Sequence, residues 1–592
     1  MKGFYEHPLN ASHTRGIHVA EENTTPAHMI YSDYVEKGLR KGLAEALWGR
    51  IPSTMGDAYE VLVRKRSEYR VPDELEGFKK ALKGLQRSMG LLTGRVEEGI
   101  DRLDRGVVES GQQPMCLSGP SLILNKVAYT HSMCGLGDDG FVPVYYNADY
   151  DGVQAELLNI RLPSPSTRGL LLSYPAEPGD EGVPIRMLRN PSEEWLRKTV
   201  EKIEGNLRGI MKGVDPGTQG RVAQNLSHSL TILRSAYYST GNVSDWAART
   251  LGALINLESD MGVPIVSPSD PGLRPFFQGG YEYLLSEPVR SRFVEASNRA
   301  AGLVEGAGFR AQIGARAVDY VPFFLECMSP GCRRSRVELK YLDGSVKGRC
   351  LKCGEEYAFS FNPGSPDLTD IIDWVSPRVD SRQFIVDSVM PVLAHVGGPG
   401  ETSYFAEVAP AARELGVAFP QYLRYTRVFY NTPWNEAAAK EVKAQGCPAI
   451  LDDELFGALS RWVEARNVGD GEALAEAHRL IRASIESGFG SLVGETERLQ
   501  AGIDGIKGRL GAAEDRGPLI KEMRDKQSRL GVLELYLSWA YGRFSPEKLG
   551  QEVNWHWLDL ATVTGVGDLM GVYRRVYNRW TPNSSVYFAN TG

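Results

Sequence analysis

One stretch constrains the fold of this chain more than any other: residues 107–126, VVESGQQPMCLSGPSLILNK, which read as a strand, a polar turn and a helix start. Val107 and Val108 are β-branched and favour a strand. Two breaks follow, at Gly111, Gln112, Gln113 and Pro114, and then at Gly119 and Pro120. Ser121 is predicted to cap the helix, and Lys126 lies about one and a half turns into it.

This arrangement suits an anion, because backbone amides at a helix start, two glutamine amides and a lysine can bind phosphate or carboxylate. An ordinary βα turn is the alternative, since neither a Walker motif nor a dinucleotide fingerprint fits the segment.

The rest of the chain alternates between short apolar runs and helical periodicity, which favours a parallel sheet with helices on both faces. Further strands are expected at 142–146, 263–266, 391–395 and 419–424, and two shorter strands at 157–162 and 170–174 are expected to form a hairpin outside the sheet. Residues 32–105 show a helical pattern, and residues 1–30 are polar and irregular, as in a surface arm.

A second glycine-rich turn, VGGPGE at 396–401, follows an apolar strand and precedes a helix expected over 402–415. Its members Gly397, Gly398 and Glu401 are candidates for the same cleft as the first turn, together with Asp149 and Asp151 after the strand at 142–146. Ligands of open α/β sheets bind at the carboxyl ends of the strands. We therefore expect the turns at 111–113, 149–151 and 397–401 and the helix start at 119–126 to converge.

Four of the seven cysteines have metal-site spacing: Cys327, Cys332, Cys350 and Cys353 form a C-x4-C and a C-x2-C pair seventeen residues apart. Four thiolates enclose a tetrahedral zinc with no open position, so a structural zinc ribbon is predicted. Two chance thiol pairs, or a redox pair at Cys350 and Cys353, are the alternatives. The ribbon is rich in arginine and lysine, which indicates a solvated surface or, less favoured, a nucleic-acid footprint.

Composition restricts the partners and the cellular location that this chain can have. The chain has 592 residues, a formal net charge of −7 and a pI of about 5.9, so its global charge gives no argument for nucleic-acid binding, and no nucleic-acid partner is expected. It has neither an apolar run long enough for a membrane span nor the apolar segment of a secretory signal, and its cysteine spacing suits a reducing compartment. A cytoplasmic location without membrane contact is expected.

Near the end of the chain, Leu492, Leu499, Ile503, Ile506 and Leu510 follow a coiled-coil seam that continues at Met523, Leu530, Leu533 and Leu537 after a break at Gly517. An antiparallel helical hairpin is predicted, and a homodimer through it is expected. The last 50 residues hold three tryptophans and are expected to pack on the body rather than to be disordered.

The segment 107–126 resembles the first core motif of the BshC family, the bacillithiol biosynthesis cysteine-adding enzymes, which show V-x-x-G-Q-Q … G-P … K. Other stretches resemble that family in the same order: VPVYY at 142–146, SPSDPGLR at 267–274, AGFRAQI at 307–313 and VGGPGETSYFAE within 380–425. The resemblance implies an α/β fold with a Rossmann-like parallel-sheet core similar to class I aminoacyl-tRNA synthetases, helical insertions, and a C-terminal coiled coil associated with dimerisation.

On this basis the chain divides into an N-terminal helical region (1–106), a Rossmann-like core (107–450), a coiled-coil domain (451–545) and a packed tail (546–592). The core carries a helical insertion at about 192–257 and the zinc ribbon at about 323–360. The ribbon falls where the family has a short β connection, so it is an elaboration that the family lacks.

The resemblance further implies a ligase that forms an amide between cysteine, or another amino acid, and the amine of an amino-sugar conjugate such as glucosaminyl-malate, with ATP or ADP involved. It marks Asp149, Asp151 and Glu401 as catalytic candidates. It marks as substrate- or nucleotide-binding candidates Gly111, Gln112, Gln113, Gly119, Pro120, Lys126, Gly397, Gly398 and Tyr404.

One departure from the family concerns its D-H-D-like cluster after the second strand. Here Tyr150 takes the place of the histidine between Asp149 and Asp151, or, in gap-free register, Gly152 does. His395 precedes the second glycine turn and is predicted to be a core or strand-end residue. Because the family's histidine is absent, the alternative is a non-catalytic factor on a synthetase-like core that binds RNA or protein through the ribbon.

Overall fold

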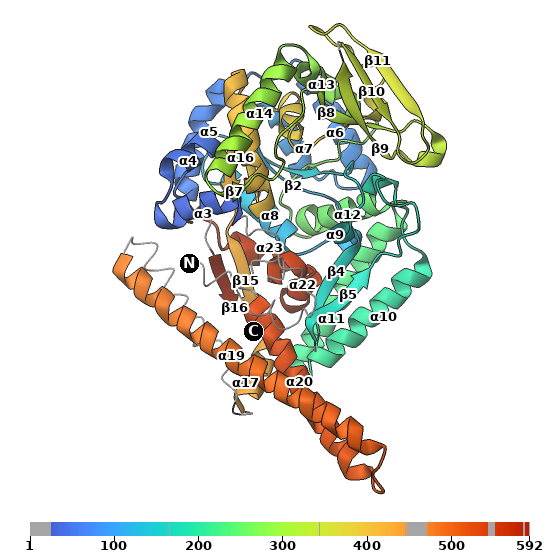
Figure 1. Cartoon of the computed structure of the whole chain (residues 1–592), viewed down its shortest axis with the longest axis vertical. Coiled ribbons are helices and arrows are strands. Elements are labelled where there is room, and N and C mark those ends of the chain that lie inside the picture. The colour runs from blue at the N-terminus through green and yellow to red at the C-terminus, as the bar shows by residue number, and fades with distance from the viewer. Residues whose placement is uncertain are drawn as a thin grey trace.

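The computed structural model describes residues 25–164, 166–342, 344–444, 446, 471–542, 551–583 and 586–590. At its centre lies a five-stranded sheet whose strands are all parallel, in the order β14-β13-β2-β3-β6 (Figure 1). These strands are β2 (Val107–Gln112), β3 (Val142–Asn147), β6 (Ile265–Val266), β13 (Val392–Gly397) and β14 (Gln421–Arg424). The predicted Rossmann-like α/β core is confirmed.

The sheet separates two hydrophobic cores because side chains alternate between its faces. Val108 and Tyr145 pack in one core, whereas Val107, Val144 and Tyr146 pack in the other. Helix α8 (Leu122–Cys134) packs on β2 and β3, and α14 (Val289–Gly306) packs on α16 (Pro399–Leu415), the helix that follows β13. The N-terminal helices are α3 (His28–Lys37), α4 (Lys41–Trp48), α5 (Met55–Lys65), α6 (Leu75–Ser88) and α7 (Gly94–Asp101).

A second five-stranded sheet is antiparallel and contains the ribbon (Figure 1). Its order is β11-β10-β9-β8-β12, and its strands are β8 (Tyr320–Glu326), β9 (Arg336–Leu342), β10 (Ser345–Arg349), β11 (Glu356–Ser360) and β12 (Val375–Pro377). Val337, Leu339 and Val346 of this sheet are buried in the same hydrophobic core as Val107 of the parallel sheet. The ribbon is therefore packed on the body rather than tethered to it.

The strands expected outside the parallel sheet form a hairpin of β4 (Asn159–Ser164) and β5 (Ser166–Ser173). A short helix, α9 (Ala155–Leu158), occupies the start of the first expected strand. The remaining helices of the core are α10 (Glu193–Ile210), α11 (Pro216–Tyr238), α12 (Val243–Gly252), α13 (Gln278–Leu285), α15 (Arg382–Asp387) and α17 (Pro433–Ala444).

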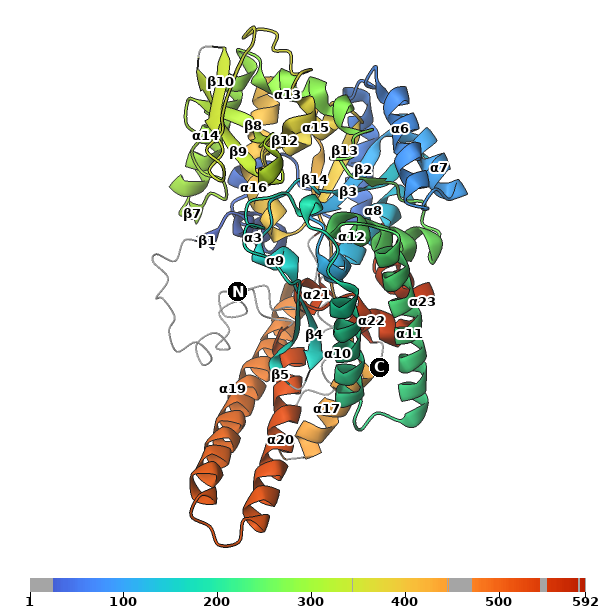
Figure 2. The same ribbon diagram turned by 90° about the vertical axis from the view of Figure 1, so that its right-hand side faces the viewer.

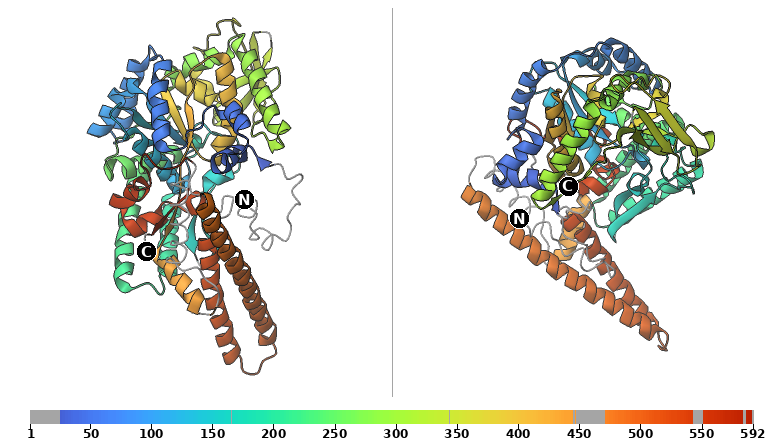
Figure 3. Two further views of the ribbon diagram at one scale, coloured as in Figure 1. Left: turned by 90° about the vertical axis from the view of Figure 1, so that its left-hand side faces the viewer. Right: turned by 45° about the horizontal axis from the view of Figure 1, so that its top comes forward.

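Helices α19 (Gly471–Leu510) and α20 (Gly517–Gly542) run antiparallel as a hairpin that projects from the body (Figures 2 and 3). Leu492, Leu499, Ile503, Ile506 and Leu533 of the predicted seam are buried. The side chain of Leu537, residues 1–24 of the predicted surface arm and residues 451–470 lie outside what the structure describes. Within the described residues, no helix is long and apolar enough to cross a membrane.

The C-terminal residues pack against the core rather than against the hairpin. Helix α22 (Leu558–Thr564) packs on α11 and α23 (Val566–Arg574) packs on α8, while α21 (Gln551–Asn554) lies beside β15 (Arg427–Asn431). Strand β16 (Val586–Asn590) pairs in parallel with β15. Trp555 and Trp557 are buried, whereas Trp580 is exposed.

Candidate functional site

Three of the four predicted turns meet at the carboxyl edge of the parallel sheet, because β13, β2 and β3 are direct neighbours and run the same way. One glycine permits the close approach of β2 and β3. A Cβ on Gly111 would lie 2.9 Å from the Tyr146 carbonyl oxygen, so a larger side chain would push these two strand ends apart. Gly397 serves its own turn, since a Cβ there would lie 2.7 Å from the Glu401 Cβ.

Lys126 and Glu401 join the first and third turns. Lys126 Nζ lies 2.8 Å from both carboxylate oxygens of Glu401, and it donates to the Gly111 carbonyl at 3.1 Å and to Gln112 Oε1 at 3.0 Å. The Lys126 side chain is 2% exposed and that of Glu401 is 17% exposed. Burial alone would raise the pKa of Glu401, but the Lys126 ammonium, His395 and the Gly398 amide hold it well below its usual range. Glu401 is thus an anion bound within the protein.

His395 lies behind this pair, between two carboxylates. Its Nε2 is 3.8 Å from Glu401 and its Nδ1 is 3.8 Å from Glu109, distances of ion pairs rather than hydrogen bonds. Burial disfavours the imidazolium, but Glu109 and Glu401 outweigh it and raise the pKa of His395. The ring also stacks on Phe405. These two flanking carboxylates go beyond the core role predicted for His395. The sequence signal for one of them was Glu109, a charged residue directly after two valines in a buried strand.

The turn after β3 contributes two acids with different surroundings. Asp151 accepts from Gln113 Nε2 at 2.6 Å and pairs with Arg336 Nη2 at 2.6 Å. Asp149 is buried and accepts from the Ser269 amide at 3.2 Å. Burial raises the pKa of Asp149 to about 7, although Arg186 and Arg274 act against the shift. Tyr150, which replaces the family's histidine in one register, is buried with its hydroxyl 3.4 Å from that of Tyr146.

The predicted helix start, the first residues of α8, is covered by another segment and is not exposed to a ligand. The predicted cap is wrong: Ser121 has helical backbone angles, and its hydroxyl donates to the Glu552 carbonyl at 3.4 Å instead of capping the helix. Its amide donates to the Trp555 carbonyl at 3.0 Å, and Pro120 forms a bridge with His556. The C-terminal segment thus covers Gly119 and Pro120, and of the helix-start residues only Lys126 reaches the other turns.

The raised pKa of Asp149 predicts a pH effect on stability. The pKa of Asp149 in the folded protein, about 7, exceeds the ordinary value of 3.8. The contribution of Asp149 to the free energy of unfolding is therefore complete below about pH 4 and is lost as the pH rises towards 7. At about 1.4 kcal/mol per pKa unit, the loss is roughly 4 kcal/mol at most. We expect Asp149→Asn, which keeps an acceptor for Ser269, to remove this pH dependence. Denaturation of both proteins from pH 4 to 8 measures it, and parallel curves would contradict it.

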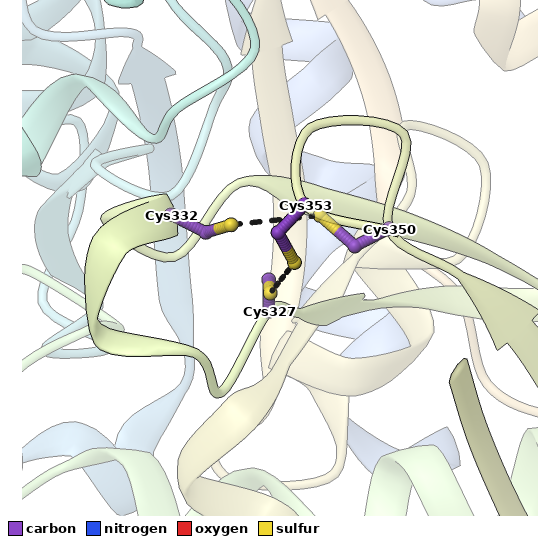
Figure 4. A group of neighbouring side chains, drawn as sticks. All are labelled: Cys327, Cys332, Cys350 and Cys353. Carbon is purple, nitrogen blue, oxygen red and sulfur yellow. Dashed lines mark hydrogen bonds between the residues drawn. The ribbon is translucent and has the colours of Figure 1, made fainter. Parts of the chain in front are cut away.

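The four predicted metal ligands form a compact cluster, with all four sulfur atoms within 4.8 Å of one another (Figure 4). Cys327 Sγ lies 3.6 Å from Cys353 Sγ, and Cys332 Sγ lies 3.8 Å from Cys350 Sγ. A tetrahedron with metal–sulfur bonds of about 2.3 Å has edges of about 3.8 Å. The Cys350 amide donates to the Glu355 carbonyl and the Gly354 amide to the Cys350 carbonyl, each at 2.8 Å, as in a tight knuckle. The cluster can hold a metal ion.

Residues beside the first knuckle reach into the body. Arg333 and Arg334 are consecutive residues with positive φ, of 51° and 58°. Arg333 pairs with Asp180, and Arg334 pairs with Glu326, a fully buried carboxylate that also binds Arg186 and Arg274. With Arg336 on Asp151, these arginines bind the chain's own acids and account for much of the ribbon's basic character. The sequence could not show the pairings of Arg333 and Arg336 because their partners are 153 and 185 residues away in the chain.

A parallel sheet with helices on both faces and polar turns at its carboxyl edge defines a Rossmann-like α/β protein. The family model of the bacillithiol biosynthesis BshC N-terminal Rossmann-like domain matches residues 33–424, and the chain belongs to this family. Curated relatives carry the name "Putative cysteine ligase BshC". The protein of Cytophaga hutchinsonii is 22% identical over 74% of each chain, and that of Carboxydothermus hydrogenoformans is 22% identical over 74% of this chain and 76% of its own. The protein of Koribacter versatilis is 25% identical over 55% of this chain and 56% of its own.

Proposed function

We propose that this protein is a ligase that forms an amide bond between the carboxylate of cysteine, or of another amino acid, and the amine of an amino-sugar conjugate such as glucosaminyl-malate. It would act in the biosynthesis of bacillithiol or a related low-molecular-weight thiol. The observation that carries the proposal is the contact of Lys126 with both Gln112 and Glu401, because it unites the two motifs on which family membership rests. The names of the relatives support the reaction class.

The residues at the sheet edge differ in what they offer this reaction. A carboxylate is a poor electrophile and has to be activated, for which a nucleotide is the proposed co-substrate. The attacking amine then loses a proton, and Asp149 is the acid best suited to take it, because its pKa of about 7 lies near neutral pH. Asp151 and Glu401 are already bound by cations, so we assign them to positioning and to holding the substrate ammonium.

The four cysteines are assigned to structural zinc. Four thiolates leave no coordination position for a substrate, and zinc prefers this ligand set. The alternative function, RNA or protein binding through the ribbon, loses part of its support because Arg333, Arg334 and Arg336 are engaged within the chain. The proposed cytoplasmic location and homodimer follow from the composition and from the helical hairpin.

Ligation can be tested directly. The purified protein, incubated with L-cysteine, glucosaminyl-malate and ATP, is expected to yield the amide, detected by mass spectrometry. Asp149→Asn should slow the reaction about 100-fold or more, the usual effect of losing a general base. Asp138→Asn is the matched control, since Asp138 is an exposed acid before β3, on the side opposite the turn. Absence of amide product with every amino acid tested would refute the ligase.

A further inference from the structure

Arg382 stands apart from the other cations at the carboxyl edge. Lys126 pairs with Glu401 and Arg336 pairs with Asp151, but the described residues provide no carboxylate within ion-pair distance of Arg382. Its Nη2 donates to the Tyr404 hydroxyl, and its guanidinium carbon lies 5.6 Å from the centroid of the Tyr404 ring. This arginine was not singled out from the sequence, although it lies in the stretch 380–425 that resembles the family.

The surroundings of Arg382 place it in the candidate site. It begins α15, and Tyr404 is three residues beyond Glu401 on α16. Tyr146 of β3 and Tyr150 after it are both buried, and together with Asp151 they favour the charged form of Arg382. Burial disfavours the guanidinium, yet the nearby phenols and Asp151 keep its pKa above the ordinary range. Arg382 therefore stays charged between two of the turns that converge at the edge.

Within the described residues, Arg382 is the cation of this group that lacks an acidic partner. Lys126 pairs with Glu401 and Arg336 pairs with Asp151, whereas Arg382 is half-buried and donates to the Tyr404 hydroxyl. A bound anion would give its guanidinium the counter-charge that the described side chains do not supply. The planar fork of arginine matches a carboxylate or a phosphate through two parallel hydrogen bonds.

We propose that Arg382, assisted by the Tyr404 hydroxyl, binds an anionic group of a substrate, a carboxylate or a phosphate, at the carboxyl edge of the parallel sheet. The inference rests on the proposed function in taking this edge as the substrate site. The proposal identifies the Arg382 guanidinium as the group that recognises the substrate's negative charge. This guanidinium lies near Asp151 of the turn after β3.

The test measures anion binding by the full-length, metal-loaded protein with two probes, L-malate and inorganic phosphate, by calorimetry. We expect binding of at least one probe, and the tighter one identifies the group that Arg382 takes. Arg382→Met should weaken that binding at least tenfold. Arg378→Met is the matched control, since Arg378 also lies over aromatic rings, at 4.2 Å from Phe324, but is paired with Glu338 at 3.0 Å; it should bind the probe as the wild type does.

The melting temperature of the variant shows whether Arg382 recognises an anion or only supports the fold. In anion-free buffer Arg382→Met should melt close to the wild type, because the variant loses the hydrogen bond to the Tyr404 hydroxyl but no ion pair. If Arg382→Met does not fold, Arg382→Lys, which lacks the planar fork, replaces it, and weaker binding is again expected. Unchanged binding in the variant tested, or no binding of either probe by the wild type, would overturn the proposal. Amide formation is scored independently, so failure of anion binding and failure of the ligase are distinguishable.

Discussion

Replacing Cys350 by serine is expected to abolish stoichiometric metal binding and to unfold the ribbon while the parallel sheet persists. The two knuckles are held together mainly by four thiolates, and structural zinc sites contribute about 10–16 kcal/mol in isolated zinc-finger peptides. Elemental analysis should give about one zinc per chain for the wild type and none for the variant. Hydrogen exchange should become faster over residues 327–360 but not in β2 or β13.

Cys134→Ala is the control for this experiment, because it removes a thiol outside the cluster and should retain the metal. Loss of the metal should also affect the candidate site, because Arg336 on β9 forms an ion pair with Asp151. Wild-type protein that contains no stoichiometric metal when purified under reducing conditions would contradict the assignment. Unchanged hydrogen exchange over residues 327–360 in the metal-free variant would also contradict it.

Lys126→Met is expected to destabilise the core by about 3–5 kcal/mol, because it leaves the Glu401 carboxylate without its cation in a buried setting. The sequence marks Lys126 as a binding candidate, but its burial and its four contacts give it a structural role as well. Gln113 is less buried, and its replacement by alanine should affect stability less.

The Lys126→Met/Glu401→Gln double variant is the control, since it removes both charges and should recover much of the loss. Amide exchange in β2 and β13 measures the free energy of opening for all three proteins. A single variant that loses less than about 1 kcal/mol, or a double variant less stable than the single one, would show that the pair does not hold the turns together.

The sequence predicted the parts of the fold that local pattern encodes. Apolar runs ending in glycine, glutamine or acidic turns indicated parallel strands, and the common direction of such strands brings their turns to one edge. The cysteine spacing likewise led to the cluster of four thiols. These features could be predicted because each one lies within a short segment.

What the sequence missed depends on contacts between distant segments. Arg336 meets Asp151 across 185 residues, and the helix start at Ser121 is covered by Trp555, so its amides are not free for a ligand. Arg382 precedes the glycine turn of the stretch 380–425, and nothing in its local pattern marks it as a binding residue. Glu326 carried a local signal, since it is a charged residue at the end of an apolar strand, where burial requires a partner. Glu109 carried a weaker form of the same signal, since it follows two valines in a buried strand.

The central claim is that substrates bind at the carboxyl edge of the parallel sheet. A crystal structure of the zinc-loaded protein with L-cysteine, glucosaminyl-malate and a non-hydrolysable ATP analogue tests it most directly. We predict ligand density against Gln112, Asp151, Arg382 and Glu401. Density confined to the ribbon or to the hairpin of α19 and α20, with this edge unchanged, would contradict the account.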